Sequence, residues 1–330
     1  MQTANRISGY TISVSEYTMQ FTSLEICAGA GGQALGLERA GFTHTALIEI
    51  EPLACATLKA NRPNWDIIET DVRQFKGSTF AGTDLLAGGV PCPPFSKAGK
   101  QLGSDDERDL FPEAIRLTRE IRPKAVMLEN VRGLLDPKFN EYRHHITDQF
   151  TKLGYTGQWK LLYAADFGVS QLRPRVLFVA MKPEYAPYFH WPEASKTPPL
   201  TVGQLLLDSM SENGWEQAYE WHLKANQIAP TLVGGSKKHG GADLGPTRSK
   251  QAWADLSVDG SGLWDKPPAK DFIGIPRLTT KMAALIQGFP ADWIFVGKKT
   301  PAYRQIGNAF PPPVAEAVGK QIIKALKQEA

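Results

Sequence analysis

A cysteine enclosed by prolines is the residue of this chain best suited to covalent chemistry. Cys92 lies in the run Asp84-Leu-Leu-Ala-Gly-Gly-Val-Pro-Cys-Pro-Pro-Phe-Ser96, where an apolar stretch leads into two glycines and then into a turn. A thiol on a stiff turn at the end of a buried strand is placed to attack a substrate, because ligands bind at the carboxyl ends of such strands. A cysteine that served only packing would normally lie within a strand or helix. The pattern therefore predicts a nucleophile at Cys92.

A glycine-rich stretch after the first apolar segment predicts a ligand-binding loop. Residues 21–26 lead into Cys27-Ala28-Gly29-Ala30-Gly31-Gly32, where glycines let the backbone approach a ligand and a following helix offers unpaired N–H groups. Gly29-x-Gly31-x-x-Ala34, with Glu49 twenty positions after Gly29, also satisfies the dinucleotide fingerprint. Glu49 is then placed to accept hydrogen bonds from ribose hydroxyls. This motif alone does not distinguish NAD from S-adenosylmethionine.

Composition and charge exclude some classes of protein without choosing among the rest. The 330 residues carry a net charge of +3, with 42% hydrophobic and 22% charged residues, as in ordinary globular proteins. So mild a charge permits a nucleic-acid partner without predicting one. The cysteines at 27, 55 and 92 form no zinc-binding spacing, which favours a reducing, cytoplasmic setting and no metal site. We find no signal peptide and no apolar stretch long enough to span a membrane.

The elements that must position these residues alternate between strands and helices. We expect, in order, a strand over 21–26, a helix over 33–40, a strand over 45–50, a helix over 52–61, strands over 65–68 and 83–87, a helix over 111–121, a strand over 125–128, a helix over 142–153, and strands over 158–164 and 175–180. Such alternation predicts an α/β fold with a parallel, doubly wound, Rossmann-like sheet.

The alternation stops after about residue 181, which divides the chain. We expect an arm of unknown role over 1–20, a catalytic and cofactor-binding domain over 21–183, a smaller irregular domain over 184–298, and a segment over 299–330 that packs back on the larger domain. A helix over 314–326 should dock on the sheet, because Val314, Val318, Ile322 and Leu326 share one face. The tryptophans at 215, 221, 253 and 264 are predicted to form the core of the smaller domain.

The order of motifs along the chain resembles that of the DNA (cytosine-5) methyltransferases. The matching stretches, in order, are the Gly29–Gly32 loop, Glu49, Asp71-Val72, Pro91-Cys92, Glu129-Asn130-Val131, Gln171-x-Arg173-x-Arg175, the segment from Pro276 to Pro290, and Gln305-Ile-Gly307-Asn308-Ala309. They cover nearly the whole chain from residue 21 onward. The resemblance implies a methyltransferase fold specialised for S-adenosylmethionine, with the smaller domain recognising the target sequence.

The resemblance assigns chemistry to four side chains. Carbon 5 of cytosine is a poor nucleophile, and a thiolate that adds at C6 makes it reactive, so Cys92 is the implied nucleophile. Glu129 is implied to contact N3 and the exocyclic amine, and Arg175 to contact O2, with Arg173 beside it binding base or phosphate. The target base must leave the duplex for this chemistry.

The resemblance also implies which residues bind the cofactor and the DNA. No metal is expected. S-adenosylmethionine would contact Cys27, Ala28, Gly29, Gly31, Gly32, Glu49, Ile50, Asp71, Val72, Gly89, Pro91, Asn308 and Ala309. Double-stranded DNA would contact Ser96, Lys97, Lys100, Gln171, Thr231, Gly234, Gly235, Lys237, Lys238, His239 and Arg248. The implied enzyme is a prokaryotic monomer whose functional partner is a restriction endonuclease of the same specificity.

Three residues depart from the family pattern, and other interpretations stay open. Pro93 stands where Gln is frequent, Ile50 where an aromatic residue often stacks on adenine, and Cys27 where Phe is common. A cytosine-5 methyltransferase acting on tRNA is the main alternative, although the Cys-Phe-Thr tripeptide typical of that branch is missing. A nicotinamide oxidoreductase would leave Cys92 and Glu129 unexplained. A catalytically dead DNA-binding protein would be expected to have lost one of these two residues.

Overall fold

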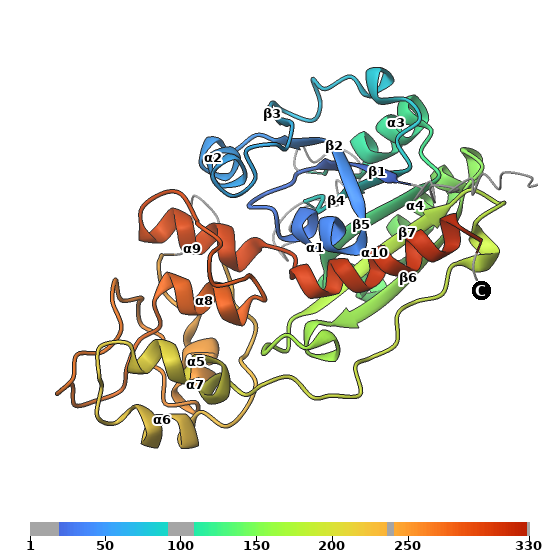
Figure 1. The fold of residues 1–330 in the computed structure, drawn as a ribbon. Coiled ribbons are helices and arrows are strands. Elements are labelled where there is room, and N and C mark those ends of the chain that lie inside the picture. The colour runs from blue at the N-terminus through green and yellow to red at the C-terminus, as the bar shows by residue number, and fades with distance from the viewer. Residues whose placement is uncertain (1–19, 92–108, 236–240, 329–330) are drawn as a thin grey trace, which may run out of the picture.

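Seven strands form the sheet that organises the larger domain (Figure 1). The computed structural model describes residues 20–91, 109–235 and 241–328. The sheet order is β3-β2-β1-β4-β5-β7-β6. Its strands are β1 (Phe21–Ile26), β2 (Phe42–Glu49), β3 (Ile67–Glu69), β4 (Leu85–Gly88), β5 (Ala125–Val131), β6 (Thr156–Tyr163) and β7 (Pro174–Met181).

The sheet is mixed, so the prediction of a parallel sheet is wrong for β7, which runs opposite to the other strands. Strands β1 to β5 pair in parallel, whereas β7 runs antiparallel to both β5 and β6. The connection from β6 to β7, residues 164–173, contains one short 3-10 turn and no crossover helix, which a parallel pairing would require. The order still reverses between β1 and β4, and ligands of doubly wound sheets bind at the carboxyl ends of strands at such a point.

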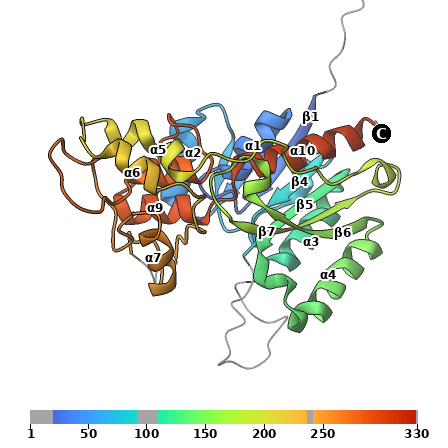
Figure 2. The ribbon, with the colours of Figure 1, turned by 90° about the horizontal axis from the view of Figure 1, so that it is seen from below.

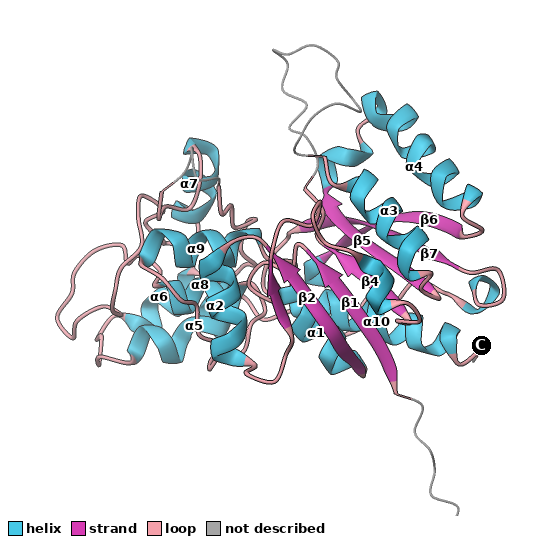
Figure 3. Ribbon diagram, turned by 90° about the horizontal axis from the view of Figure 1, so that it is seen from above, coloured by secondary structure: helices cyan, strands magenta, loops and turns pink. Residues whose placement is uncertain are grey.

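Helices cover both faces of the sheet because strand side chains alternate between the faces. Figure 3 shows α3 (Phe111–Ile121) and α4 (Asn140–Lys152) on one side of the strands, and α1 (Gly32–Ala40) and α10 (Pro312–Leu326) on the other. Helices α1 and α10 lie side by side (Figure 2). Val314, Val318 and Ile322 pack with Leu37, Leu85 and Met127, which confirms the predicted docking of the last helix.

The smaller domain, which we expected to be irregular, contains five helices among the described residues. It contains α5 (Val202–Ser211), α6 (Ala218–Lys224), α7 (Thr247–Ala254), α8 (Thr280–Ile286) and α9 (Lys299–Asn308). Trp215, Trp221 and Trp253 are buried in its core and Trp264 is partly buried, as predicted. Helix α9 contributes Tyr303 and Ile306 to the same core, so within the 299–330 segment only the part around α10 packs on the sheet.

The element bounds agree with the expected ones at several places and differ where tertiary pairing extends a strand. Strand β1, helix α2 (Pro52–Asn61) and helix α3 have the predicted bounds. Strand β5 runs three residues beyond the predicted end at 128, because its ladder with β7 continues to the pair Val131 and Arg175. Short 3-10 turns occur at Gly77–Phe80, Arg132–Leu135, Pro137–Phe139, Ala164–Phe167 and Ala186–Tyr188. Among the residues described, no helix has the length and apolarity that a membrane span needs.

Candidate active site

A buried ion pair between two adjacent strands forms the centre of the site. Glu129 on β5 and Arg175 on β7 lie 2.8 Å apart between Oε1 and Nε, and their side chains are 11% and 10% exposed. Burial raises the pKa of Glu129, although Arg175 and then Arg173 act in the opposite direction. The carboxyl therefore keeps its proton to a higher pH than an exposed glutamate would, and it can act as a proton donor.

The turn after β4 is held against this ion pair by Asn130. The Asn130 side chain donates from Nδ2 to the carbonyl oxygen of Val90 at 2.8 Å and accepts at Oδ1 from the N–H of Val131 at 2.8 Å. The N–H of Leu110 donates to the carbonyl of Pro91 at 3.3 Å. The backbone is thus fixed up to the residue before Cys92, which itself lies outside the described residues. Sequence reasoning quoted Asn130 as part of a motif but gave it no role.

Glu49 fastens the glycine-rich loop to the end of β2. Its carboxylate accepts hydrogen bonds from the N–H groups of Gly29 at 2.7 Å, Ile50 at 2.9 Å and Glu51 at 2.8 Å. Burial raises the pKa of Glu49, and these N–H groups lower it in part. A carboxylate offers about four acceptor positions, so one remains for an incoming hydroxyl. The predicted ribose contact is compatible with this geometry.

The glycine-rich loop adopts a backbone that few other residues could follow. Gly29 and Gly31 have φ of 54° and 85°. A Cβ on Gly32 would lie 2.2 Å from the carbonyl oxygen of Phe310, so a side chain there would displace the opposite wall. Cys27 also has a positive φ, 53°, and burial followed by Glu49 raises the pKa of its thiol. The close approach of this loop to residues 309–310 explains why glycine is needed.

Two cavities flank the loop and share Cys27 and Glu49 as lining residues. The sheet-edge cavity, about 420 Å³, is lined by Cys27, Ile48, Glu49, Ile50, Thr70, Asp71, Val72, Arg73, Pro91 and Leu110. The junction cavity, about 660 Å³, lies between the domains and is lined by residues that include Glu25, Cys27, Ala28, Gly29, Gly32, Gln33, Glu49, Gly89, Glu129, Gly235, Asn308, Ala309 and Phe310. The structure therefore brings all the predicted cofactor residues except Gly31 to the linings of these two cavities.

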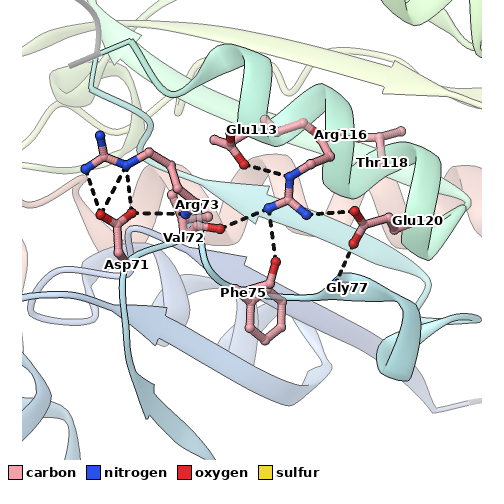
Figure 4. Close-up of polar contacts among 10 residues, drawn as sticks. Asp71, Val72, Arg73, Phe75, Gly77, Glu113, Arg116, Thr118 and Glu120 are labelled. Carbon is pink, nitrogen blue, oxygen red and sulfur yellow. Dashed lines mark hydrogen bonds and ion pairs between the residues drawn. The ribbon is translucent and has the colours of Figure 1, made fainter. Parts of the chain in front are cut away.

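Arg116 of α3 binds the backbone at and after Val72, a residue that lines the sheet-edge cavity (Figure 4). Arg116 donates from Nη2 to the carbonyls of Val72 and Phe75, both at 3.0 Å. It also pairs with Glu113 and Glu120, each at 2.7 Å. Beside it, Arg73 binds the carboxylate of Asp71 at 2.7 Å and lowers the pKa of that carboxyl. These contacts fix the Asp71-Val72 backbone from both sides.

Two polar residues that sequence reasoning missed line the junction cavity. Glu25 is 1% exposed and its Oε2 has no hydrogen-bond partner within the described residues. Gln33 is 3% exposed, and within that same part of the chain neither atom of its amide has a partner. Burial, followed by Glu49, raises the pKa of Glu25 well above its usual value. Unpaired buried polar groups are costly, so a polar ligand would complete them. The position of Glu25 at the end of β1 was the available signal.

Gln171 and Arg173 turn inward instead of toward a substrate. Both are 0% exposed. Gln171 bonds to Gln287 and to the N–H of Leu232, each at 2.8 Å, while Arg173 donates to the carbonyls of Leu232, Gly307 and Ala309. The side-chain contact of Gln171 with DNA, and of Arg173 with a base, is therefore not supported by this structure. Arg175 is the arginine that reaches Glu129.

Comparison of the sequence with known proteins identifies the family of this chain. The model of the C-5 cytosine-specific DNA methylase family matches residues 21–324. The chain belongs to that family. It is 69% identical over 314 residues to the type II methyltransferase M.NgoMIV of Neisseria gonorrhoeae, covering 94% of this chain and 100% of the relative. It is 56% identical over 313 residues to the type II methyltransferase M.NaeI of Lentzea aerocolonigenes, covering 93% and 75%.

The methylase also shares its fold with more distant solved structures. A protein encoded in an Escherichia coli prophage aligns with a TM-score of 0.66 at 23% identity, over 93% of this chain and 99% of its own. A variant of DNMT2 from Spodoptera frugiperda aligns with a TM-score of 0.63 at 17% identity, over 92% and 99%. At such identities the likeness shows the fold. The family match itself identifies a DNA cytosine-5 methyltransferase of the type II restriction-modification kind and rejects the oxidoreductase interpretation.

Of the residues predicted to touch DNA, some lie on the smaller domain and others lie outside the described residues. One segment of the smaller domain carries Thr231, Gly234 and Gly235. This segment lies beside Asn308, whose Nδ2 donates to the carbonyl of Gly235 at 3.2 Å. Arg248 is exposed on α7. The other predicted contacts lie outside the described residues: Ser96, Lys97, Lys100, Lys237, Lys238 and His239.

Proposed function

We propose that this methylase transfers a methyl group from S-adenosylmethionine to C5 of a flipped-out cytosine in a short, specific double-stranded DNA sequence, through a covalent bond between Cys92 and C6. The Glu129–Arg175 ion pair carries this proposal, because it lies beside the turn that leads to Cys92 and Glu129 lines the junction cavity. A Cβ on Gly89 would lie 3.3 Å from Glu129 Oε2, so this turn passes close to the carboxyl.

The two cavities fit S-adenosylmethionine by the chemistry of their linings. The sheet-edge cavity offers Ile48, Ile50 and Val72 to an adenine ring, with aliphatic packing where an aromatic residue is common. Glu49 has an acceptor position for a ribose hydroxyl. In the junction cavity Glu25 Oε2 and the Gln33 amide, which have no hydrogen-bond partner among the described residues, suit the amino-acid end together with Asn308. Once bound, the cofactor supplies an electrophilic methyl group.

The protein's own groups supply the rest of the reaction. The Cys92 thiolate forms a bond to C6, and the electron pair of the C5–C6 double bond becomes available at C5. Glu129 gives its proton to N3, which neutralises the negative charge that thiolate addition brings to the ring and leaves Glu129 as a carboxylate. After C5 is methylated, the C5 proton passes to water. The C6–S bond then breaks, which restores the double bond and the thiolate, and N3 returns its proton to the Glu129 carboxylate.

Arg175 orients the base and keeps Glu129 in place. Its guanidinium, held by Glu129 and by the carbonyl of Pro174 at 2.8 Å, is directed to cytosine O2. A base within a duplex cannot reach this depth, so the enzyme acts on a base rotated out of the helix. The smaller domain then supplies the DNA contacts, with Thr231, Gly234, Gly235, Arg248 and the basic residues at 237–239 facing phosphates or base edges.

The biological setting we propose is protection of host DNA. A cytoplasmic, monomeric methylase of this kind would mark the sites of a restriction endonuclease with the same specificity. The type II methyltransferases that it resembles support this role.

Bisulfite sequencing of DNA from a host without its own cytosine methylation tests the proposal. Cells would express the native chain, Cys92→Ala or, as a matched control, Cys55→Ala, which removes a buried thiol outside both cavities. We expect one short protected motif with the native chain and the control, and none with Cys92→Ala. Protection by Cys92→Ala would refute the covalent step. Methylated RNA without methylated DNA would favour the tRNA alternative.

A further inference from the structure

A fully buried arginine joins the two domains at the wall of the junction cavity. Arg173, just before β7, is 0% exposed. Its Nη1 donates to the carbonyl of Leu232 at 2.8 Å. Its Nη2 donates to the carbonyls of Gly307 at 2.7 Å and Ala309 at 2.8 Å. One guanidinium therefore ties the larger domain to two separate segments, the one around residue 232 and the end of α9.

Gln171 and Gln287 extend this connection into a network. Gln171 Oε1 accepts from the N–H of Leu232 at 2.8 Å and from Arg173 Nη1 at 3.4 Å. Gln171 Nε2 donates to Gln287 Oε1 at 2.8 Å, and Gln287 donates in turn to the carbonyl of Ala309 at 2.5 Å. Buried networks in which the members satisfy one another are rigid and specify one arrangement. The network fixes how the smaller domain meets β7.

The segments held by Arg173 form part of the cavity itself. Asn308 lies between the two carbonyls that Arg173 Nη2 binds, and Asn308, Ala309 and Gly235 all line the junction cavity. The contact between the segments leaves no room for side chains. A Cβ on Gly307 would lie 2.4 Å from the nitrogen of Gly234, and a Cβ on Gly234 would lie 2.5 Å from Asn308 Oδ1. A small shift of either segment would therefore move Asn308.

We propose that Arg173 is a positioning residue: it holds the Asn308 wall of the junction cavity and the Leu232–Gly235 segment in a fixed relation to the Glu129–Arg175 pair, and it touches neither base nor cofactor. Arg175 follows Arg173 by two residues, so the segment that binds the wall also carries the arginine of the ion pair. This inference rests on the proposed function and assigns Arg173 a role different from that implied by the family resemblance.

The geometry requires a guanidinium. Three carbonyls on two segments are bound through two nitrogens in a planar fork, which a lysine ammonium on its flexible stem does not reproduce. Arg173→Lys keeps the charge but loosens the wall. The free enzyme should then bind cofactor less well even without DNA, whereas a residue that contacts only the target base would leave that affinity unchanged.

Titration calorimetry with S-adenosylhomocysteine, in the absence of DNA, tests the inference. We expect Arg173→Lys to weaken binding about tenfold, as for lost hydrogen bonds from a charged group. Arg62→Lys is the matched control, because Arg62 also connects the domains: it pairs with Glu38 at 2.9 Å and lies 5.3 Å from the Trp293 ring centre. It binds no carbonyl of the cavity wall, and we expect a change within about twofold.

Thermal melting shows whether each variant is folded at the temperature of the binding measurement. If Arg173→Lys and Arg62→Lys bind S-adenosylhomocysteine like the native chain, the inference is wrong whatever their melting temperatures. If Arg173→Lys does not fold, Gln171→Asn serves instead, because it removes the bond to Leu232 and leaves the guanidinium; weaker binding supports the inference and native binding refutes it. Failure of the proposed function looks different, since the native chain itself would not bind S-adenosylhomocysteine.

Discussion

The two cavities beside Cys27 and Glu49 are built in different ways. The sheet-edge cavity is lined by residues between 27 and 110, all of them in the larger domain, and Arg116 binds the backbone at and after Val72. The junction cavity combines residues 25–54, Gly89 and Glu129 of the larger domain with Gly235 and residues 301–310. The first cavity forms when the sheet and its own turns fold. The second exists only when the smaller domain is docked, so it is the part of the site that domain contacts control.

This difference separates two kinds of ligand contact. Binding of adenosine alone should depend on the sheet-edge cavity. Binding of the amino-acid end of the cofactor and of the target base should depend on the junction cavity. A pair of ligands, S-adenosylhomocysteine and 5′-methylthioadenosine, which lacks the amino-acid end, therefore reports on the cavities separately.

The largest expected effect comes from Glu129→Gln. It removes the proton donor of the junction cavity and should lower kcat roughly 100-fold to 10,000-fold, the range for general acid catalysis. Binding of 5′-methylthioadenosine should persist, because Glu129 does not line the sheet-edge cavity. Burial raises the pKa of Glu129, so the protonated form is lost as pH rises through that raised value, and native kcat should fall there. A Glu129→Gln variant that keeps this descending limb would contradict the assignment.

A smaller loss is expected from Asn130→Ala. Without the bond to the Val90 carbonyl the turn before Cys92 is free to move, and a displacement of about 1 Å can cost roughly 100-fold in kcat. Both ligands should bind as they do to the native chain. Thr118→Ala is the control, since it removes a hydroxyl that is equally buried but bonds within its own helix. An equal loss of kcat in both variants would show that Asn130 acts through stability alone.

Gly234→Ala should separate the cavities most directly. The new Cβ would overlap Asn308 and the Arg304 carbonyl at 2.6 Å, and relief of the overlap displaces the cavity wall. We expect about fivefold weaker binding of S-adenosylhomocysteine, in line with the cost of overpacking, and unchanged binding of 5′-methylthioadenosine. Gly133→Ala, where a Cβ meets nothing within 4 Å, is the control. Equal weakening for both ligands would mean that the two cavities are not independent.

The smallest effect is a pH-dependent change in stability. The folded chain holds a proton on Glu25 that the unfolded chain releases above about pH 4.3, so this residue lowers native stability as pH rises. Glu25→Gln removes that dependence. Its stability relative to the native chain, from thermal melts, should therefore improve as the pH rises from 5 to 8. A constant difference would show that the carboxyl is paired in solution.

The strands and their carboxyl ends could be predicted from the sequence, because the patterns that indicate them are local. Apolar runs and turn residues place β1 and α3 at their observed bounds, whereas Glu129 and Arg175 were identified from the motif order that resembles the cytosine-5 methyltransferases. The direction of β7 was mispredicted, since an apolar strand has the same pattern whether it pairs in parallel or antiparallel.

The inward roles of Gln171 and Arg173 depend on contacts that no local pattern encodes. Their partners lie around residues 232, 287 and 307–309, far away in sequence. The same holds for Gln33, because its burial, and the lack of a partner for its amide within the part of the chain that the structure describes, arise only when α1 is packed on the sheet. Short-range patterns thus predict which residues carry chemistry, and long-range docking decides which of them reach the substrate.

The pairing of α1 with α10 has a consequence for how the enzyme is made. Helix α1 is among the first elements to leave the ribosome, yet its neighbour begins at Pro312, and Gly36 fits against the carbonyl of Pro312 with no space for a side chain. Until residues 312–326 are synthesised, the part of this sheet face that α10 covers stays exposed beside α1, and the nascent chain presents apolar side chains to solvent. Translation that stalls before this helix would therefore yield aggregating fragments and no partly active methylase.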